Sequence, residues 1–216
     1  MARMKLAVLI SGRGSNLQAL LAAASDPDYP AEIALVVSNE PTAPGLAHAE
    51  SADVPTEIVD HRDFNSRPGF EAALNSSLIA AGVDAVVLAG FMRVLTADFV
   101  DAWPDRLINI HPSLLPAFPG ADAVRNALAA GVKITGTTVH FVRDAVDDGP
   151  IIAQAAVPVL ADDDVHHLAA RIRTVEHKLL PHCIARIAKG KTSVIGKWVT
   201  IEGEPAEAAR LANPLI

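Results

Sequence analysis

Short apolar runs alternate with polar turns and helically spaced segments along the first half of the chain. Four runs have the length and apolar content of strands: 5–10, 32–38, 56–59 and 84–89. Three segments between them carry apolar residues at helical spacing: 17–24, 45–52 and 70–81. Because strands and helices take turns, this pattern predicts parallel strands joined by right-handed crossovers.

The second half begins with a short predicted strand at 107–110, which Pro104 and Pro112 confine on either side. Two later segments have strand patterns and two have helical spacing: 134–141 and 151–159, then 122–130 and 165–189.

The chain is therefore expected to form one α/β domain that is Rossmann-like. Its central sheet should be mostly parallel and flanked by helices, with antiparallel additions in the C-terminal part. Residues 1–190 are assigned to this domain. Residues 191–216 are assigned to a hairpin around 198–201 and a weakly ordered tail, both packed on the same domain.

A glycine-containing turn follows the first predicted strand and precedes the first helix. It reads Ser11-Gly12-Arg13-Gly14, and Ser15 or Asn16 can cap the helix. Unpaired backbone N–H groups and the positive end of a helix dipole meet at such a turn, so a phosphate is the predicted ligand. A structural tight turn is the alternative.

Two familiar nucleotide motifs do not fit this turn. Leu17 stands where the third glycine of a dinucleotide fingerprint should be, and no Lys-Ser or Lys-Thr pair completes a Walker A loop. A nicotinamide enzyme and a P-loop NTPase are therefore disfavoured.

A polar amide and an imidazole interrupt the apolar run at 107–110. Side chains alternate across a strand, so Asn109 and His111 point to one side while Ile108 and Ile110 point to the other. An amide donor beside a protonatable ring suits a reaction in which negative charge develops on a carbonyl oxygen. From spacing alone, a strand-end pair that satisfies a turn remains the alternative.

Three segments, taken in order, resemble the folate-dependent formyltransferase family: SGRGSNL at 11–17, GFMRVL at 90–95 and NIHPSLLP at 109–116. The similarity runs from about residue 5 to about residue 181 and is strongest to the branch that acts on a glycinamide ribonucleotide. It implies transfer of the formyl group of 10-formyltetrahydrofolate to the primary amine of that ribonucleotide in purine synthesis, through a tetrahedral intermediate.

The resemblance also implies roles for particular residues. The catalytic residues would be Asn109, His111 and Asp147. The ribonucleotide would be bound by Gly14, Ser15, Asn16, Arg173 and Glu176, the last two on the polar side of the long helix. The folate would be bound by Arg67, Met92, Arg93, Val94, Leu95, Asn109, Arg143, Asp144, Ala145, Val146 and Asp147.

Several of these positions have a plainer interpretation, and two depart from the family pattern. Met92, Val94 and Leu95 match core residues by pattern, and the acids at 144–148 match a solvated turn. Asp148 stands where glycine is common, and Pro68 after Arg67 is atypical. His140 is expected to be a supporting residue.

Composition narrows the classes of partner. Hydrophobic residues make up 50% of the 216 residues and charged residues 20%, as in globular proteins. The formal charge of -7 argues against a nucleic-acid surface, and no apolar run reaches the roughly 18 residues of a membrane span. Small-molecule substrates are expected, with no nucleic acid or membrane as partner. A homodimer is left open.

Cysteine and histidine positions complete the expectations. Cys183 is the only cysteine and lies in an apolar helical segment, which fits the core of a cytoplasmic protein, and no signal peptide is predicted. His166 and His167 are adjacent, and His177 and His182 are five apart, so neither pair is expected to form a helical metal-binding face. No metal is expected.

Three rivals to the ribonucleotide reaction are considered. Enzymes that formylate methionyl-tRNA normally carry an additional C-terminal RNA-binding domain, and 191–216 is too short and too weakly basic for one. Formyltetrahydrofolate hydrolases carry an extra N-terminal regulatory domain that is not expected here. A non-catalytic sensor of a phosphorylated metabolite would bind at 12–16 without turnover, which an intact Asn109, His111 and Asp147 disfavour.

Overall fold

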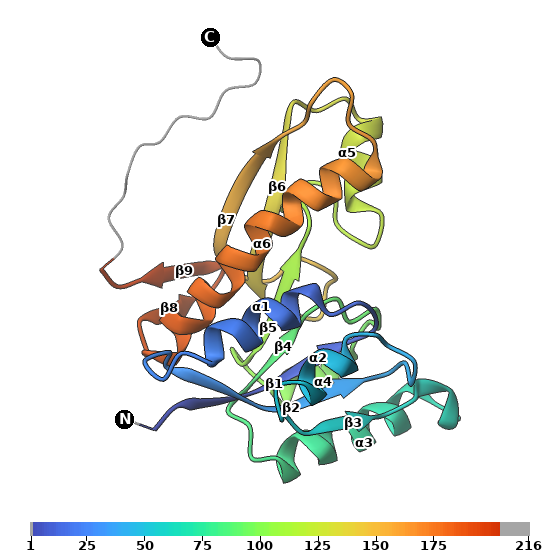
Figure 1. Ribbon diagram of the computed structural model, residues 1–216, viewed down its shortest axis with the longest axis vertical. Coiled ribbons are helices and arrows are strands. Elements are labelled where there is room, and N and C mark those ends of the chain that lie inside the picture. The colour runs from blue at the N-terminus through green and yellow to red at the C-terminus, as the bar shows by residue number, and fades with distance from the viewer. Residues whose placement is uncertain (1, 204–216) are drawn as a thin grey trace.

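Seven strands form one sheet through the middle of the molecule in the computed structural model, which describes residues 2–203 (Figure 1). The strands are β1 Met4–Ile10, β2 Ala31–Ser38, β3 Thr56–Ile58, β4 Ala85–Leu88, β5 Leu107–His111, β6 Ile134–Phe141 and β7 Ile151–Pro158. Their order is β3-β2-β1-β4-β5-β6-β7. The pairs from β3 to β5 are parallel, whereas β6 and β7 are added antiparallel. The predicted fold class is confirmed.

Within residues 2–203, six helices cover the two faces of this sheet, and a short 3-10 helix, η1 His61–Asp63, precedes the third of them. They are α1 Ser15–Ala24, α2 Leu46–Glu50, α3 Arg67–Ala80, α4 Ala97–Asp101, α5 Ala123–Ala129 and α6 Val165–Ala188. Alternate residues of β1 face opposite layers: Val8 packs in the cluster that includes α1 and α6, and Leu9 in the cluster that includes α3 and α4. Cys183 lies in the first cluster and is fully buried, as expected.

Three local predictions were incomplete. The five-residue α4 was not predicted, although Thr96 caps it by accepting a hydrogen bond from the Phe99 N–H. Helix α3 begins at Arg67, three residues before the predicted segment 70–81, because Ser66 caps it. The N-cap of α1 is Gly14 in the left-handed region, with no side-chain cap, so Ser15 and Asn16 lie in the first turn instead.

The C-terminal part of the described chain forms the predicted hairpin, β8 Thr192–Ile195 and β9 Trp198–Ile201. Val194, Val199 and Ile201 pack against the core cluster on the α6 side. The predicted tail, from residue 204 onward, lies outside the described residues. Among the helices of the described residues, none is long and apolar enough to cross a membrane.

The strand order reverses next to β1, which is flanked by β2 on one side and β4 on the other. The loops that leave the carboxyl ends of β1 and β4 therefore diverge and open a crevice between them, the usual ligand position in open α/β sheets. The glycine loop (residues 11–14) follows β1, and residues 90–95 follow β4. Both motifs thus lie at this crevice.

Candidate active site

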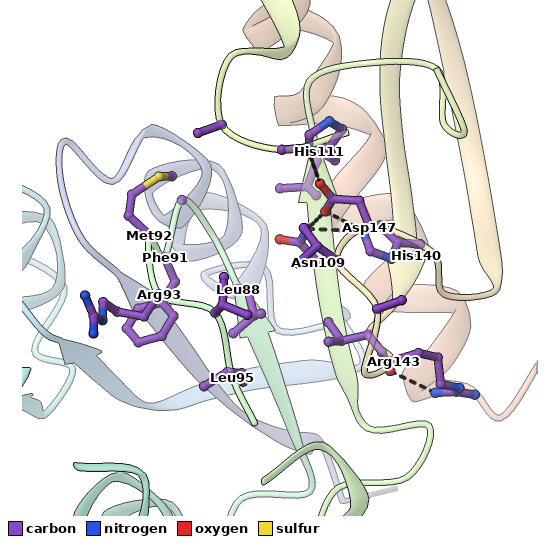
Figure 2. Close-up of a pocket in the computed structure, with 18 of the residues that line it drawn as sticks. Leu88, Phe91, Met92, Arg93, Leu95, Asn109, His111, His140, Arg143 and Asp147 are labelled. Atoms are coloured by element: carbon purple, nitrogen blue, oxygen red, sulfur yellow. Dashed lines mark hydrogen bonds and ion pairs between the residues drawn. The ribbon is translucent and has the colours of Figure 1, made fainter. Parts of the chain in front are cut away.

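A cavity of about 260 Å³ opens at the carboxyl ends of β4 and β5 (Figure 2). It is lined by Leu88, Gly90, Phe91, Met92, Arg93, Val94, Leu95, Asn109, Ile110, His111, Pro112, Gly120, Ala121, His140, Val142, Arg143, Asp144, Ala145, Val146 and Asp147. Most of these side chains are apolar, while Asn109, His111, His140 and Asp147 gather at one end, where β5, β6 and the loop before β7 meet. The cavity suits a flat, largely apolar ligand that has one polar reacting group.

Three side chains converge at the polar end. Asn109 and His111 lie two residues apart on β5 and point to the same side, as predicted, and Asp147 reaches them from the loop before β7 (Figure 2). The Asp147 Oδ2 lies 3.3 Å from His111 Nδ1, and its Oδ1 accepts a hydrogen bond of 3.4 Å from Asn109 Nδ2. One carboxylate therefore holds both predicted catalytic groups.

Both ring nitrogens of His111 face hydrogen-bond acceptors. Nδ1 faces Asp147, and Nε2 lies 2.9 Å from the carbonyl oxygen of Phe118 in the loop after β5. An imidazole donates from both nitrogens only when it is protonated, so these partners suit the charged ring. The ring is 5% exposed, which shields these contacts from water.

The Asn109 amide is turned with its nitrogen toward the protein. Nδ2 lies 3.1 Å from His140 Nε2 and 3.4 Å from Asp147 Oδ1, so both of its N–H groups are used. The amide oxygen points toward the side of the cavity formed by Leu88 and Phe91 (Figure 2). His140 Nδ1 in turn lies 3.0 Å from the Phe141 carbonyl oxygen. In this arrangement His140 accepts from Asn109 and donates to the backbone.

The environment of Asp147 favours its charged form. Burial alone would raise the pKa of this carboxyl, but a hydrogen bond from the Gly120 N–H and the charge of His111 act against it, and the pKa is lowered. The Gly120 N–H lies 2.8 Å from Asp147 Oδ2. The neighbouring Asp148 points away and forms an exposed ion pair with Lys197 of the β8–β9 turn, so Asp147 is the carboxylate that faces His111.

The residues predicted to bind folate are almost all gathered around this cavity. Met92, Arg93, Val94, Leu95, Asn109 and 143–147 line it. Met92 and Val94 are exposed although they are large and apolar, which is unusual outside a binding surface. Arg67 is the exception: it lies at the start of α3 and does not line the cavity.

The residues predicted to bind the ribonucleotide lie where α1 meets α6. Asn16 Nδ2 donates a 3.0 Å hydrogen bond to Glu176 Oε2, which joins the first turn of α1 to α6. Glu176 is 5% exposed, so its predicted place on the polar side of α6 was wrong: it faces the sheet, where Thr137 Oγ1 lies 3.5 Å from its Oε1. Burial raises the pKa of this carboxyl, although Asn16 and Arg173 oppose the shift.

Glu176 and His111 are linked through one side chain of β6. Thr137 Oγ1 lies 3.0 Å from the His111 carbonyl oxygen and 3.5 Å from Glu176 Oε1. The two predicted substrate regions therefore meet near His111, one on each side of β5 and β6.

Comparison with known proteins places this site in a family. The formyl transferase family profile matches residues 4–184. The chain belongs to this family. Phosphoribosylglycinamide formyltransferase of Escherichia coli is 41% identical to it over 93% of this chain and 95% of that protein. The Haemophilus influenzae protein of the same name is 37% identical over 97% and 99%.

Solved members of the formyl transferase family share the whole fold. Glycinamide ribonucleotide transformylase 1 of Symbiobacterium toebii is 47% identical, with a TM-score of 0.90 over 92% of this chain and 94% of that one. Among curated relatives, the trifunctional purine biosynthetic protein adenosine-3 of Drosophila melanogaster is 50% identical over 92% of this chain. The chain spans only 14% to 19% of the length of such trifunctional relatives.

Sequence reasoning about this formyl transferase site missed the groups that hold its polar end. Phe118 contributes a carbonyl oxygen and Gly120 an N–H, both from the loop after β5. Residue type does not show which backbone groups will be used in a site. The prolines and glycine at 112–120 indicate only that this segment is an irregular loop. His140 was predicted only as a support, and it contacts Asn109 directly.

Asp164, His166 and His167 form the one group of possible metal ligands found among the described residues. They are exposed at the start of α6, none of them lines the cavity, and Asp164 already caps the helix by accepting from the His167 N–H. This group therefore has no part in the site.

Proposed function

We propose that the chain transfers the formyl group of 10-formyltetrahydrofolate to the primary amine of N1-(5-phospho-D-ribosyl)glycinamide, a step of purine (IMP) synthesis. The observation that carries this proposal is the convergence of Asn109, His111 and Asp147 at the polar end of an otherwise apolar cavity. Two relatives that match over nearly their whole length are phosphoribosylglycinamide formyltransferases, which supports the proposal.

In the proposed reaction, the amine nitrogen of the ribonucleotide forms a bond to the formyl carbon. The carbonyl electrons move onto its oxygen and give a tetrahedral intermediate with an oxyanion. The bond from that carbon to N10 of the folate then breaks, and the proton lost by the amine is delivered to N10. The products are the N-formyl ribonucleotide and tetrahydrofolate, and no other reactant is needed.

Asn109 and His111 stabilise the oxyanion as hydrogen-bond donors. Their donors face Asp147, His140 and the Phe118 carbonyl oxygen in the structure. A half-turn of the Asn109 amide would bring Nδ2 into the cavity, and His111 Nε2 would exchange the Phe118 oxygen for that of the substrate. Catalytic hydrogen bonds commonly form only in the complex, so this change is expected of a loaded site.

Asp147 orients both donors and places a negative charge beside His111. Its lowered pKa leaves it ionised, and its 3.3 Å contact with His111 Nδ1 favours a protonated ring in the transition state. With Asp147 as its partner, His111 can also pass a proton toward N10 as the folate departs.

The ribonucleotide is held by the start of α1 and by α6. The first N–H groups of a helix have no partner within it, and those near Gly14, Ser15 and Asn16 face the crevice, where a phosphate would complete them. Asn16 Oδ1 is buried and has no hydrogen-bond partner among the described residues, so it can accept from a ligand. Arg173 would add positive charge, and Glu176 would accept from hydroxyl or amine groups.

The folate occupies the cavity. Met92, Val94 and Leu95 offer apolar contact to the pterin, and the backbone groups of 90–95 and 143–147 can pair with its polar edge. Arg67 and Arg143 are proposed for its anionic tail, and Arg143 would exchange its ion pair with Asp105 for that tail.

The proposed reaction uses small molecules and no metal, and neither nucleic acid nor a membrane takes part in it. A cytoplasmic location fits the single cysteine. The enzyme would act as a monomer or as a homodimer. Residues 1–190 would form the catalytic domain.

One assay under three conditions tests the proposal: with the ribonucleotide, with methionyl-tRNA and with no acceptor. Purified protein with 10-formyltetrahydrofolate should release tetrahydrofolate in step with formylated product when the glycinamide ribonucleotide is present. Release at the same rate with no acceptor would indicate a hydrolase, and release only with methionyl-tRNA would indicate the tRNA branch. Binding of the ribonucleotide without any release would indicate a sensor.

A further inference from the structure

Residues 90–95, named here the cavity loop, form a wall of the cavity without regular secondary structure. Two protein anchors hold its ends. At the far end, the carboxylate of the buried Glu71 accepts hydrogen bonds from the Thr96 N–H, at 2.9 Å, and from the Thr96 hydroxyl. At the near end, both anchoring contacts come from Ser11, which follows β1.

Ser11 contacts the cavity loop twice. Its N–H donates a 3.1 Å hydrogen bond to the Gly90 carbonyl oxygen, and its Oγ accepts a 2.8 Å hydrogen bond from the Met92 N–H. Gly90 has φ +77, a conformation that glycine adopts without strain and that turns the chain sharply at this point. The Ser11 contacts therefore hold the loop just where it leaves the sheet.

The Ser11 hydroxyl is itself fixed in direction. Its single proton is donated to Asn39 Oδ1 at 2.5 Å, so its lone pairs remain for the Met92 N–H. Asn39 is 2% exposed, and its Nδ2 lies 3.2 Å from His61 Nδ1, which keeps the amide oxygen turned toward Ser11. A buried amide thus orients the hydroxyl that holds the cavity loop.

Ser11 precedes Gly12 in the loop assigned to the phosphate, yet its side chain and its N–H are both used on the cavity side. We propose that Ser11 is a positioning residue for the folate: it sets the cavity loop at the height at which Met92 to Leu95 meet the pterin. The ligand's identity rests on the proposed function, whereas the anchoring of the loop does not.

The decisive variant is Ser11→Ala. The loss of the hydroxyl removes its hydrogen bonds with Met92 and Asn39 and should raise the KM for 10-formyltetrahydrofolate about threefold to tenfold. The KM for the ribonucleotide should remain nearly unchanged, whereas the midpoint of thermal unfolding should fall, because the buried Asn39 oxygen loses its donor. Ser11→Thr retains the hydroxyl and should restore the folate KM. As the matched control from the same loop, Gly12→Ala, whose added Cβ meets no protein atom within 4 Å, should raise the ribonucleotide KM and not the folate KM.

Amide hydrogen exchange gives a readout that needs no turnover. In Ser11→Ala, the Met92 amide should exchange faster than in wild type, while the amides of α3 are unchanged. A rise in the ribonucleotide KM alone would place Ser11 in the phosphate site, and an equal rise in both KM values or an unchanged Met92 amide would also overturn the proposal. If wild-type protein shows no formyl transfer, the proposed function fails, and the exchange measurement still decides whether Ser11 holds the loop.

Discussion

The polar end of the cavity and the start of α1 use different parts of the chain. At the polar end of the cavity the functional groups are side chains: Asp147 contacts His111 at 3.3 Å and Asn109 at 3.4 Å. At the start of α1 the phosphate is expected to meet backbone N–H groups, whose position depends on the left-handed Gly14.

This difference separates chemistry from binding. A side chain at the cavity end can be changed without moving the backbone, so its loss should appear mainly in kcat. A change near Gly14 acts through the shape of the chain and should appear mainly in the KM for the ribonucleotide. Variants that mix the two effects would break the distinction.

The largest effect is expected from Asp147→Asn, which removes the charge that faces His111 while keeping the shape of the side chain. The kcat should fall on the order of 10²–10⁴-fold, because stabilisation of the protonated ring in the transition state is lost. The ribonucleotide KM should change little in steady-state assays of tetrahydrofolate release.

Asp148→Asn is the matched control from the same turn. Its carboxylate pairs with the exposed Lys197, so turnover should remain near that of wild type. If Asp148→Asn were crippled and Asp147→Asn active, the assignment of the carboxylate would be wrong. If both variants were active, a carboxylate-assisted mechanism would have to be abandoned.

A smaller effect, of the opposite kind, is expected from Glu176→Gln. Losing the charged acceptor beside Asn16 should raise the ribonucleotide KM roughly tenfold to a hundredfold with kcat less affected. A drop in kcat without a change in KM would move Glu176 from the binding group to the chemical one.

Glu176→Gln should also change how the free energy of unfolding depends on pH. The folded state binds the Glu176 proton more tightly than the unfolded chain, because burial raises its pKa above the usual value of 4.5. Wild-type protein should therefore lose stability relative to Glu176→Gln as the pH rises from about 4.5 through the raised value. Urea unfolding at pH 4.5 and pH 8 measures the free energy of unfolding of both proteins, and a wild-type value that rises relative to that of Glu176→Gln with pH would contradict the prediction.

Gly12→Ala sharpens the comparison on the loop side. A Cβ at Gly12 meets no protein atom within 4 Å, whereas one at Gly14 would lie 2.7 Å from the Gly45 Cα. Gly12→Ala should therefore fold normally and raise the ribonucleotide KM about tenfold by crowding the phosphate. Gly14→Val should in addition lower the unfolding midpoint. Titration calorimetry measures the affinity of each variant for each ligand, and scanning calorimetry measures its unfolding midpoint. An unchanged ribonucleotide affinity in Gly12→Ala would show that the loop is not part of the site.

The last expected result is that the protein does not bind tRNA tightly. With a formal charge of -7, the protein should show no tight binding of tRNA that weakens steeply with salt. A fluorescence titration at about 50 and 200 mM salt tests this, and tight, salt-sensitive binding would favour a nucleic-acid acceptor.

Much of the fold could be predicted because its signals are local. The continuous apolar run of β1 and the alternation around Asn109 and His111 follow from burial on two faces or one. The missed elements have weak local signals: α4 has five residues, and the Gly14 cap has no side chain to mark it. The burial of Glu176 depends on β6 lying across from α6, which no helical pattern encodes.

The site residues also fall into those that the sequence could predict and those that it could not. Asn109 and His111 could be paired from the sequence because they share one strand. Asp147 could be assigned only through resemblance, since its loop brings it back across 36 residues with a left-handed backbone, φ +55. Phe118 and Gly120 act through their backbone groups, so their side chains gave no signal.

The central claim is that one carboxylate-held pair performs the transfer while the start of α1 only binds the phosphate. A crystal structure with the ribonucleotide and an unreactive folate analogue tests it most directly. The account predicts the phosphate on the N–H groups of 12–16, and the analogue's carbonyl oxygen about 3 Å from Asn109 Nδ2 and a His111 ring nitrogen. A reacting carbonyl away from both side chains, or a phosphate bound in the cavity, would contradict it.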